Sequence, residues 1–301
     1  MIALLEHINL AIEASGDPTT ATARFYLDVL GCARDPRLEW MVHANIGLGQ
    51  FHLLPGQPAD QRINGEIALF YTSLNALKER LVARGQAFYE HMSDVVVPAI
   101  AVYDFAMAAR HYRHIGVSDP SGNSILCFES PHDYAAASAA LGAHPGDAAV
   151  GDGLAYIKFL VRPGAARGLG AFYQQLLGAA TVVQPLDKAA ASDLHLCSVD
   201  CGPLQRLLFE ETHELLLPYD GHHICIYVTE FEAAYHACAA KQLVWTNAIY
   251  EDKCDSWAET QKWRQFRILD IRDPGSNALL LQLEHEIRPL QHSRCPLTSA
   301  K

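Results

Sequence analysis

Apolar and polar residues alternate in short stretches, and segments with helical spacing separate these stretches. Residues 1–12 alternate, with Ile8, Leu10 and Ile12 on one face, which predicts a half-buried strand. Residues 21–30 instead carry apolar side chains at helical spacing. The chain therefore opens with a strand that leads into a helix.

The same pattern continues to the end of the chain. In the first half it predicts strands within 38–54, at 66–71, 95–102 and 112–117, and one ending at 128, with a helix at 73–84. In the second half it predicts strands at 154–161, up to about 210, and at 222–229, 265–272 and 278–284, with helices at 167–177 and 230–240. Each half thus contains two copies of one unit, which consists of a strand, a helix and several further strands.

Two motifs occur once in each half, about 150 positions apart. Phe25-Tyr26-Leu27-Asp28-Val29-Leu30-Gly31 returns as Phe172-Tyr173-Gln174-Gln175-Leu176-Leu177-Gly178, and Asp119-Pro120-Ser121-Gly122-Asn123 returns as Asp273-Pro274-Gly275-Ser276-Asn277. A repeat of this length indicates a duplicated domain, because solenoid units are only about 20 to 50 residues long. We predict a first domain at 1–134, a linker at 135–152 with some helix, a second domain at 153–290 and a loose tail at 291–301.

Composition narrows the class of protein. The net charge of −11 argues against a nucleic-acid partner, since such binders carry basic surfaces. The eight cysteines form no CxxC pair and several lie in apolar runs, which is typical of core residues in a reducing compartment. No apolar stretch reaches the roughly 18 residues of a membrane span. We expect a soluble, cytoplasmic protein with no membrane partner.

The order of these elements resembles the vicinal oxygen chelate superfamily, which includes glyoxalase I and the extradiol dioxygenases. The first strand with His7, the Phe-Tyr-x-x-x-Leu-Gly helix end and the Asp-Pro-x-x-Asn turn carry the resemblance. It implies an α+β fold of two tandem domains. Each domain has two βαβββ modules that form a cupped mixed sheet with flanking helices around a divalent metal.

The resemblance also implies four ligand positions, which we map onto the first half. The first strand offers His7, the end of the first module His52, and the opening strand of the second module Glu66, while Leu126 occupies the last position. Two imidazoles and one carboxylate suit Fe, Mn, Zn or Ni. One alternative is that both histidines are interior residues and Glu66 is a surface or rim carboxylate. The other is a rearranged site that uses other groups.

The second half lacks this set. Its counterparts of the four positions are Tyr156, Leu207, His223 and Leu280. One histidine among these residues cannot hold a metal, so we interpret the second half as structural or as a modified ligand cup. Neighbouring strand residues point to opposite faces, so at most one of His222 and His223 can face a cup.

Other polar residues have more than one interpretation. His114 could act as a general acid or base beside Glu66, or simply belong to a polar strand face. Arg113 and Arg267 each lie six residues before a turn aspartate, which favours a structural ion pair or turn anchor. We interpret residues 284–286, Glu-His-Glu, as a solvated strand end.

Two functions follow from these residues. One is a metal-dependent lyase, isomerase or dioxygenase that acts on a small molecule with vicinal oxygens. The other is a metal-free protein that binds or sequesters a small ligand. Four modules in one chain are compatible with a monomer or a homodimer.

Overall fold

The computed structural model describes residues 1–12, 20–36, 41–55, 60–141, 150–186 and 193–297. The first half contains β1 (Ile2–Ile12), α1 (Ala21–Arg24), the π-helix η1 (Phe25–Val29), β2 (Ala33–Arg34), β3 (Val42–Ile46), β4 (Gly49–Pro55), β5 (Gly65–Tyr71), α2 (Leu74–Ala83), β6 (Tyr89–His91), the 3-10 helices η2 (Ile100–Val102) and η3 (Phe105–Met107), α3 (Ala108–His111), β7 (His114–Ser118), β8 (Ser124–Glu129) and α4 (Tyr134–Ala140). The second half contains β9 (Gly153–Val161), α5 (Ala165–Leu177), β10 (Thr181–Pro185), β11 (His195–Asp200), β12 (Arg206–Glu211), β13 (His223–Val228), α6 (Phe231–Ala240), α7 (Trp257–Trp263), β14 (Phe266–Arg272) and β15 (Leu279–Pro289).

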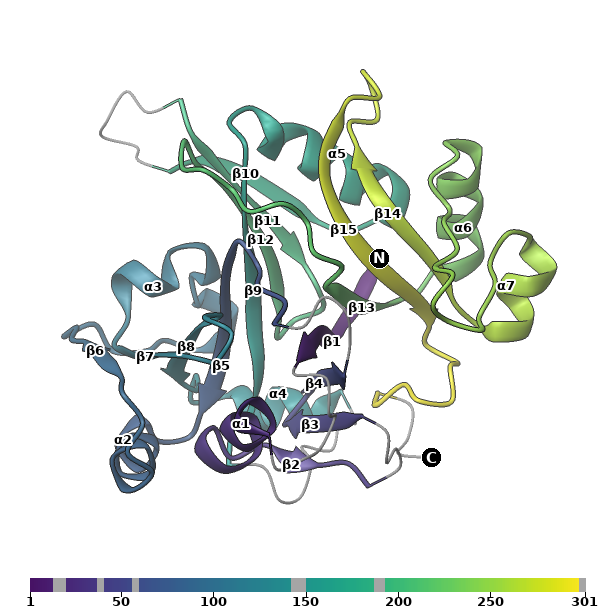
Figure 1. Cartoon of the computed structure of the whole chain (residues 1–301). Helices are drawn as coiled ribbons and strands as arrows, with labels where there is room; N and C mark the ends of the chain where they lie inside the picture. The colour runs from purple at the N-terminus through teal and green to yellow at the C-terminus, as the bar shows by residue number, and fades with distance from the viewer. Residues whose placement is uncertain (13–19, 37–40, 56–59, 142–149, 187–192, 298–301) are drawn as a thin grey trace.

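The strands form two mixed sheets, as the fold class predicted. One has seven strands in the order β14-β15-β13-β1-β4-β3-β2, and the other has eight in the order β10-β11-β12-β9-β5-β8-β7-β6 (Figure 1). We call them the seven-stranded and the eight-stranded sheet. Antiparallel pairing of β1 with β13 and of β5 with β9 joins the modules. Each sheet therefore combines a module from the first half of the chain with one from the second half.

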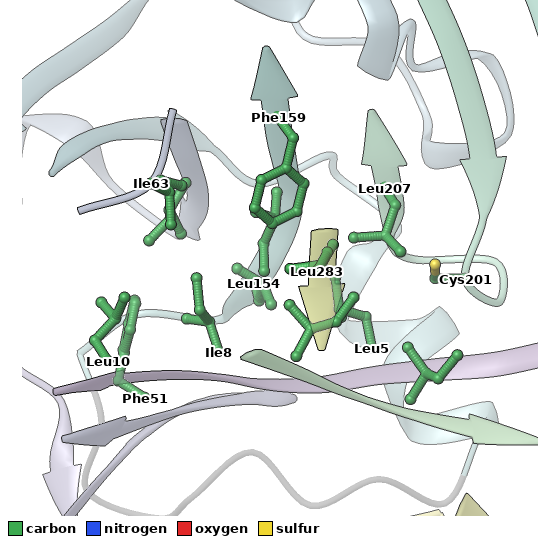
Figure 2. Close-up of a cluster of buried hydrophobic side chains, with 14 of the residues drawn as sticks. Leu5, Ile8, Leu10, Phe51, Ile63, Leu154, Phe159, Cys201, Leu207 and Leu283 are labelled. Carbon is green, nitrogen blue, oxygen red and sulfur yellow. The ribbon is translucent and has the colours of Figure 1, made fainter. Parts of the chain in front are cut away.

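The main hydrophobic core lies between the two sheets. Figure 2 shows Ile8 and Leu10 of β1 facing side chains of the eight-stranded sheet, among them Phe159 and Leu207. Helices α1, α2, α5 and α6 add buried side chains to the same cluster. Since successive strand residues point to opposite faces, the other face of each sheet is left to form a cup.

Local sequence explains where α2 begins and ends. Ser73 Oγ accepts a hydrogen bond from Ala76 N at 3.2 Å, which satisfies a backbone donor of the first turn. Leu74, Leu77 and Leu81 are buried on one side of the helix. Gly85 then adopts a φ of +66°, a conformation that favours glycine after a helix end.

Three predicted segments differ from the structure. Residues 95–102 form no strand, because Val95 and Val96 are exposed and Pro98 has no N–H to offer a neighbouring strand. The final strand continues past residue 284 to Pro289. Residues 291–297, predicted as part of a loose tail, are packed through the fully buried Cys295.

The predicted linker and the predicted tail lie only partly within the described residues. The predicted linker contains α4, while residues 142–149 and the chain end at 298–301 lie outside the described part. The domain bounds remain a prediction. Among the described residues, no helix combines the length and the apolar character that a membrane crossing requires. A cytoplasmic location also remains a prediction.

Candidate metal centre

Three histidines and a glutamate meet on the cup face of the seven-stranded sheet. His7 lies on β1, His52 on the parallel neighbour β4, His223 on the antiparallel neighbour β13 and Glu286 on β15. All four residues are buried. Two ends of the sequence, brought together by the pairing of β1 with β13, thus supply one cluster.

A bulge in β1 orients the His7 ring. The register with β13 shifts between Leu5 and His7, and the side chain of Glu6 lies beside the ring although the two residues are adjacent in sequence. His7 Nδ1 is 3.1 Å from Glu6 Oε2, so the ring donates through Nδ1, and in the neutral ring this tautomer leaves the lone pair on Nε2. A carboxylate in this position is the usual partner of a metal-binding histidine.

His7 Nε2 is buried and has no hydrogen-bond partner among the described residues. An unpaired buried acceptor costs about 1–3 kcal/mol, so such an atom calls for an explanation. The side chains of His223 and Glu286 supply one: a ligand atom from each of them and one from His7 all lie within 4.8 Å of one another. His223 Nε2 is 3.8 Å from Glu286 Oε2.

The protonation states suit metal binding. Burial, followed by the charge of Arg267, holds the pKa of His223 well below its usual value, so the ring is neutral. Burial alone would raise the pKa of Glu286, but Arg288 and Arg267 hold it well below the usual value, so the carboxylate is ionised. Neutral imidazole and carboxylate are the forms that bind a divalent metal.

A second group of possible ligands shares His7 and consists of Glu6, His7 and Cys225. It is less suited to a metal, because burial raises the pKa of the Cys225 thiol well above its usual value. Glu6 Oε2 also lies against Nδ1 of the same His7 ring, so Glu6 positions this ring and is not a separate ligand beside it. The set of His7, His223 and Glu286 therefore fits a divalent metal better.

The His52 ring stacks on the His7 ring, and His52 does not belong to the set of ligand groups formed by His7, His223 and Glu286. The ring centroids are 3.5 Å apart, and His43 stacks on the other side of His52 at 3.8 Å. His52 Nε2 lies 3.0 Å from Gln50 Oε1. Burial and the neighbouring histidines hold the pKa of His52 well below its usual value.

Two buried arginines hold the acidic residues of the cluster. Arg267 contacts Asp252, Glu284 and Glu286, and Arg288 contacts Glu6 and Glu286. The cluster thus holds four carboxylates against two guanidiniums, and burial raises the pKa of Glu284 despite its contact with Arg267. A divalent cation would add positive charge where carboxylates outnumber guanidiniums.

A cavity of about 490 Å³ opens above this cluster. His52, His223, Glu286, Arg267 and Arg288 contribute to its lining. Met41, Leu54, Tyr250 and Trp263 add apolar and aromatic surface, and the segment after β15 contributes His292, Ser293 and Arg294. A volume of this size accommodates a small organic molecule.

Several solved structures share this arrangement of elements. Glyoxalase I from Zea mays matches with a TM-score of 0.58 and 12% identity over 95% of this chain and 92% of that chain. A putative dioxygenase from Bacillus subtilis matches with a TM-score of 0.53 and 13% identity over 96% and 85%. The chain has the tandem vicinal oxygen chelate fold. At these identities the likeness shows the fold alone, and neither a family model nor a curated protein matches the sequence.

The strands beside β1 come from another part of the chain than our mapping assumed. His7 and His52 belong to the first module as predicted, but β13 and β15 of the fourth module supply the opening and last strands of the cup. His223 therefore takes the place that we had assigned to Glu66, and Glu286 the place of Leu126. Our interpretation of 284–286 as a solvated end was wrong, because all three residues are buried.

Glu66 lies in the eight-stranded sheet, apart from the histidine cluster. Its Oε1 accepts from the Tyr156 hydroxyl at 2.8 Å and lies 3.2 Å from Lys158 Nζ. His114 is on β7 of the same sheet, where its ring stacks on His91 at 4.9 Å. Burial lowers the pKa of His114, while the charge of Glu66 acts weakly in the opposite direction.

The cup of the eight-stranded sheet is filled by the chain itself. By strand register, Tyr156, Leu208, Glu66 and Leu126 correspond to His7, His52, His223 and Glu286. Our assignments of Leu207 to His52 and of Leu280 to Leu126 were therefore wrong. Residues from η2, η3 and α3 cover these positions in an apolar cluster that includes Phe105 and Tyr112. The two cups therefore differ, as predicted. The difference is between the seven-stranded and the eight-stranded sheet, and not between the first and the second half of the sequence.

The two repeated arginines are both ion-paired, as predicted. Arg113 contacts Glu90 at 2.6 Å in the eight-stranded sheet, and Arg267 contacts three carboxylates beside the histidine cluster.

Strand parity could have identified Glu286, because Glu284 and Glu286 share a face while His285 points into the core. The missing information was that β15 pairs with the strand that carries His223.

Proposed function

We propose that this protein is a divalent-metal-dependent enzyme that acts on a small molecule with vicinal oxygens in the cavity of the seven-stranded sheet. His7, His223 and Glu286 would hold the metal. The observation that carries the proposal is His7 Nε2, a buried acceptor oriented by Glu6 and left without a partner beside two further ligand groups. When bound, such a metal polarises substrate oxygens and stabilises the negative charge that develops on them.

The donor set bears on the type of reaction. Two histidines and one carboxylate with open positions form the usual arrangement for Fe(II) that activates oxygen. This favours a dioxygenase over a lyase or an isomerase, although Mn, Zn and Ni accept the same donors. The names of the similar structures, glyoxalase I and putative dioxygenase, cover both kinds of chemistry.

His52 is suited to accept a proton from the substrate. Gln50 donates to Asn45 through Nε2, so Gln50 Oε1 accepts from His52 Nε2 and leaves the His52 lone pair on Nδ1. The ring lines the cavity, and its lowered pKa keeps it neutral although it also makes the ring a weaker base than a free imidazole. We propose His52 Nδ1 as the proton acceptor, in place of Glu66 and His114.

One observation favours the second candidate, a metal-free binding protein. Both oxygens of Glu286 lie against guanidinium groups, Oε1 against Arg288 and Oε2 against Arg267. The carboxylate is thus compensated without a metal. In this alternative the cavity binds a small molecule and no reaction follows.

Metal content separates the two candidates. The chain is purified without chelators, incubated anaerobically with Fe(II), Mn(II), Zn(II) or Ni(II), desalted and analysed for bound metal. We expect about one metal per chain in the wild type, a loss of binding in His223→Ala and Glu286→Gln, and full binding in Glu66→Gln. Glu66→Gln is the matched control because it removes a partly buried carboxylate from the other sheet. No retained metal in the wild type would favour the binding protein.

A further inference from the structure

Arg267 holds three carboxylates with three different nitrogens. Nη1 is 2.6 Å from Glu284 Oε1, Nε is 2.9 Å from Asp252 Oδ2, and Nη2 is 3.2 Å from Glu286 Oε2. The contact with Glu286 is the longest of the three. It is therefore the contact that breaks most readily.

Glu286 Oε2 is also the oxygen that faces His223. It lies 3.8 Å from His223 Nε2, whereas Oε1 lies against Arg288. A divalent cation between His223 and Glu286 would contact Glu286 Oε2, the oxygen that the Arg267 guanidinium already contacts. Two cations at that distance repel each other strongly in a buried site.

Arg267 cannot withdraw from the cavity wall. Asp252 and Glu284 retain it, Asn247 Nδ2 fixes Glu284 at 2.9 Å, and the guanidinium lies 4.4 Å from the Tyr250 ring centroid. Arg288 has its own partners on the other side of the carboxylate, since it donates to Glu6 and Gln265. Of the two arginines, Arg267 is the one that shares its oxygen with the candidate metal position.

We propose, resting on the proposed metal site, that Arg267 changes partner when the site is loaded. Its Nη2 leaves Glu286 Oε2 and donates to an anionic oxygen of the ligand. The negative charge of that oxygen then lies between the metal and the guanidinium. Metal and an oxyanion ligand therefore bind cooperatively, and the ligand class is a molecule that offers an ionised oxygen, such as a carboxylate or an enolate, next to its metal-binding oxygen.

The proposal is tested with Co(II), whose visible absorption reports binding, and with acetate as the oxyanion. The dissociation constant for Co(II) is measured with and without acetate in the wild type, Arg267→Gln and Arg113→Gln. Arg113 is the matched control because it occupies the equivalent repeat position and pairs with Glu90 in the other sheet.

We expect acetate to tighten Co(II) binding about tenfold in the wild type and in Arg113→Gln, within the usual range of coupling between sites. In Arg267→Gln, Co(II) alone should bind more tightly than in the wild type, and acetate should change the constant less than twofold. Equal constants with and without acetate in the wild type, or tenfold coupling that persists in Arg267→Gln, would overturn the proposal.

The folding of the variant does not limit the test. If Arg267→Gln does not fold, Arg267→Lys replaces it, because a single ammonium group cannot hold three carboxylates at once. Absence of coupling in the wild type overturns the proposal without any variant, whereas coupling in the wild type is assigned to Arg267 by the variant. Failure of the metal site itself gives a different result: Co(II) either does not bind or binds equally well after His223→Ala and Glu286→Gln.

Discussion

His285 shows how one strand serves two environments. Glu284 and Glu286 face the cup, while His285 between them points into the core and meets Tyr173 of α5. The Tyr173 hydroxyl donates to His285 Nε2 at 2.6 Å, and His285 Nδ1 donates to Leu283 O at 2.8 Å. Burial lowers the pKa of His285 to about 4. The native state therefore keeps this ring neutral.

This pairing predicts a loss of stability in acid. The pKa of His285 in the folded chain lies below its unfolded value near 6.5, so the unfolded chain binds more protons between pH 6.5 and pH 4. The contribution is complete above about pH 6.5 and falls as the pH drops towards 4, by up to about 3 kcal/mol. Urea unfolding at a series of pH values measures it.

The partner of His285 can be tested in the same assay. Tyr173→Phe should lower the free energy of unfolding at pH 7 by about 1–3 kcal/mol, because His285 Nε2 loses its donor. Tyr103→Phe is the control, since the buried Tyr103 hydroxyl has no hydrogen-bond partner among the described residues. Equal effects of the two substitutions would contradict the role of the hydrogen bond.

At the scale of elements, hydrophobic periodicity predicted β1, α2, α5, β13 and α6 because each has a clear apolar face. It failed where tertiary contacts decide. The apolar residues 95–102 have no neighbouring strand, and the charged end of β15 is buried because arginines compensate its glutamates. Glu284 and Glu286 therefore had the sequence character of a solvated end although both are buried and Glu286 lines the cavity.

The turn between β3 and β4 shows an element held by a close approach of the backbone. Gly47 has a φ of +53°, and a Cβ atom there would lie 1.7 Å from Asp152 O. Gly85 has a φ of +66° and no atom within 4 Å of such a Cβ. Gly85→Ala should cost about 1 kcal/mol from the backbone conformation alone. Gly47→Ala should cost at least about 3 kcal/mol, because backbone must also move.

Thermal unfolding of both variants measures this difference. The two glycines share a left-handed conformation, so the larger loss in Gly47→Ala isolates the contact with the segment that enters β9. A similar shift of the melting temperature in both variants would show that the turn and this segment are not in contact.

For the whole molecule, the duplication predicted four modules but not how they pair. Each module begins with a similar strand, so β1 and β5 could each pair with the first strand of any other module. The repeated sequence does not indicate which pairing forms. The structure pairs β1 with β13 and β5 with β9. His7 and His52 could therefore be found from the sequence, whereas His223 and Glu286 needed the pairing.

This pairing predicts that the halves depend on each other. Fragments 1–141 and 150–301, expressed separately, each leave an opening strand of both sheets without its partner. We expect neither fragment to unfold cooperatively alone, and the mixture to regain the circular dichroism and the unfolding transition of the intact chain. A monomeric fragment 1–141 with a cooperative transition of its own would show that its modules pair with each other.

The central claim is that His7 from the start of the chain and His223 and Glu286 from its far end form one metal site. Anomalous diffraction from crystals soaked in Zn(II) tests it most directly. We predict one peak on the cup face of the seven-stranded sheet, about 2.0–2.2 Å from His7 Nε2, a His223 ring nitrogen and a Glu286 oxygen. A peak at Glu66, or full soaking with no peak at the histidine cluster, would contradict the claim.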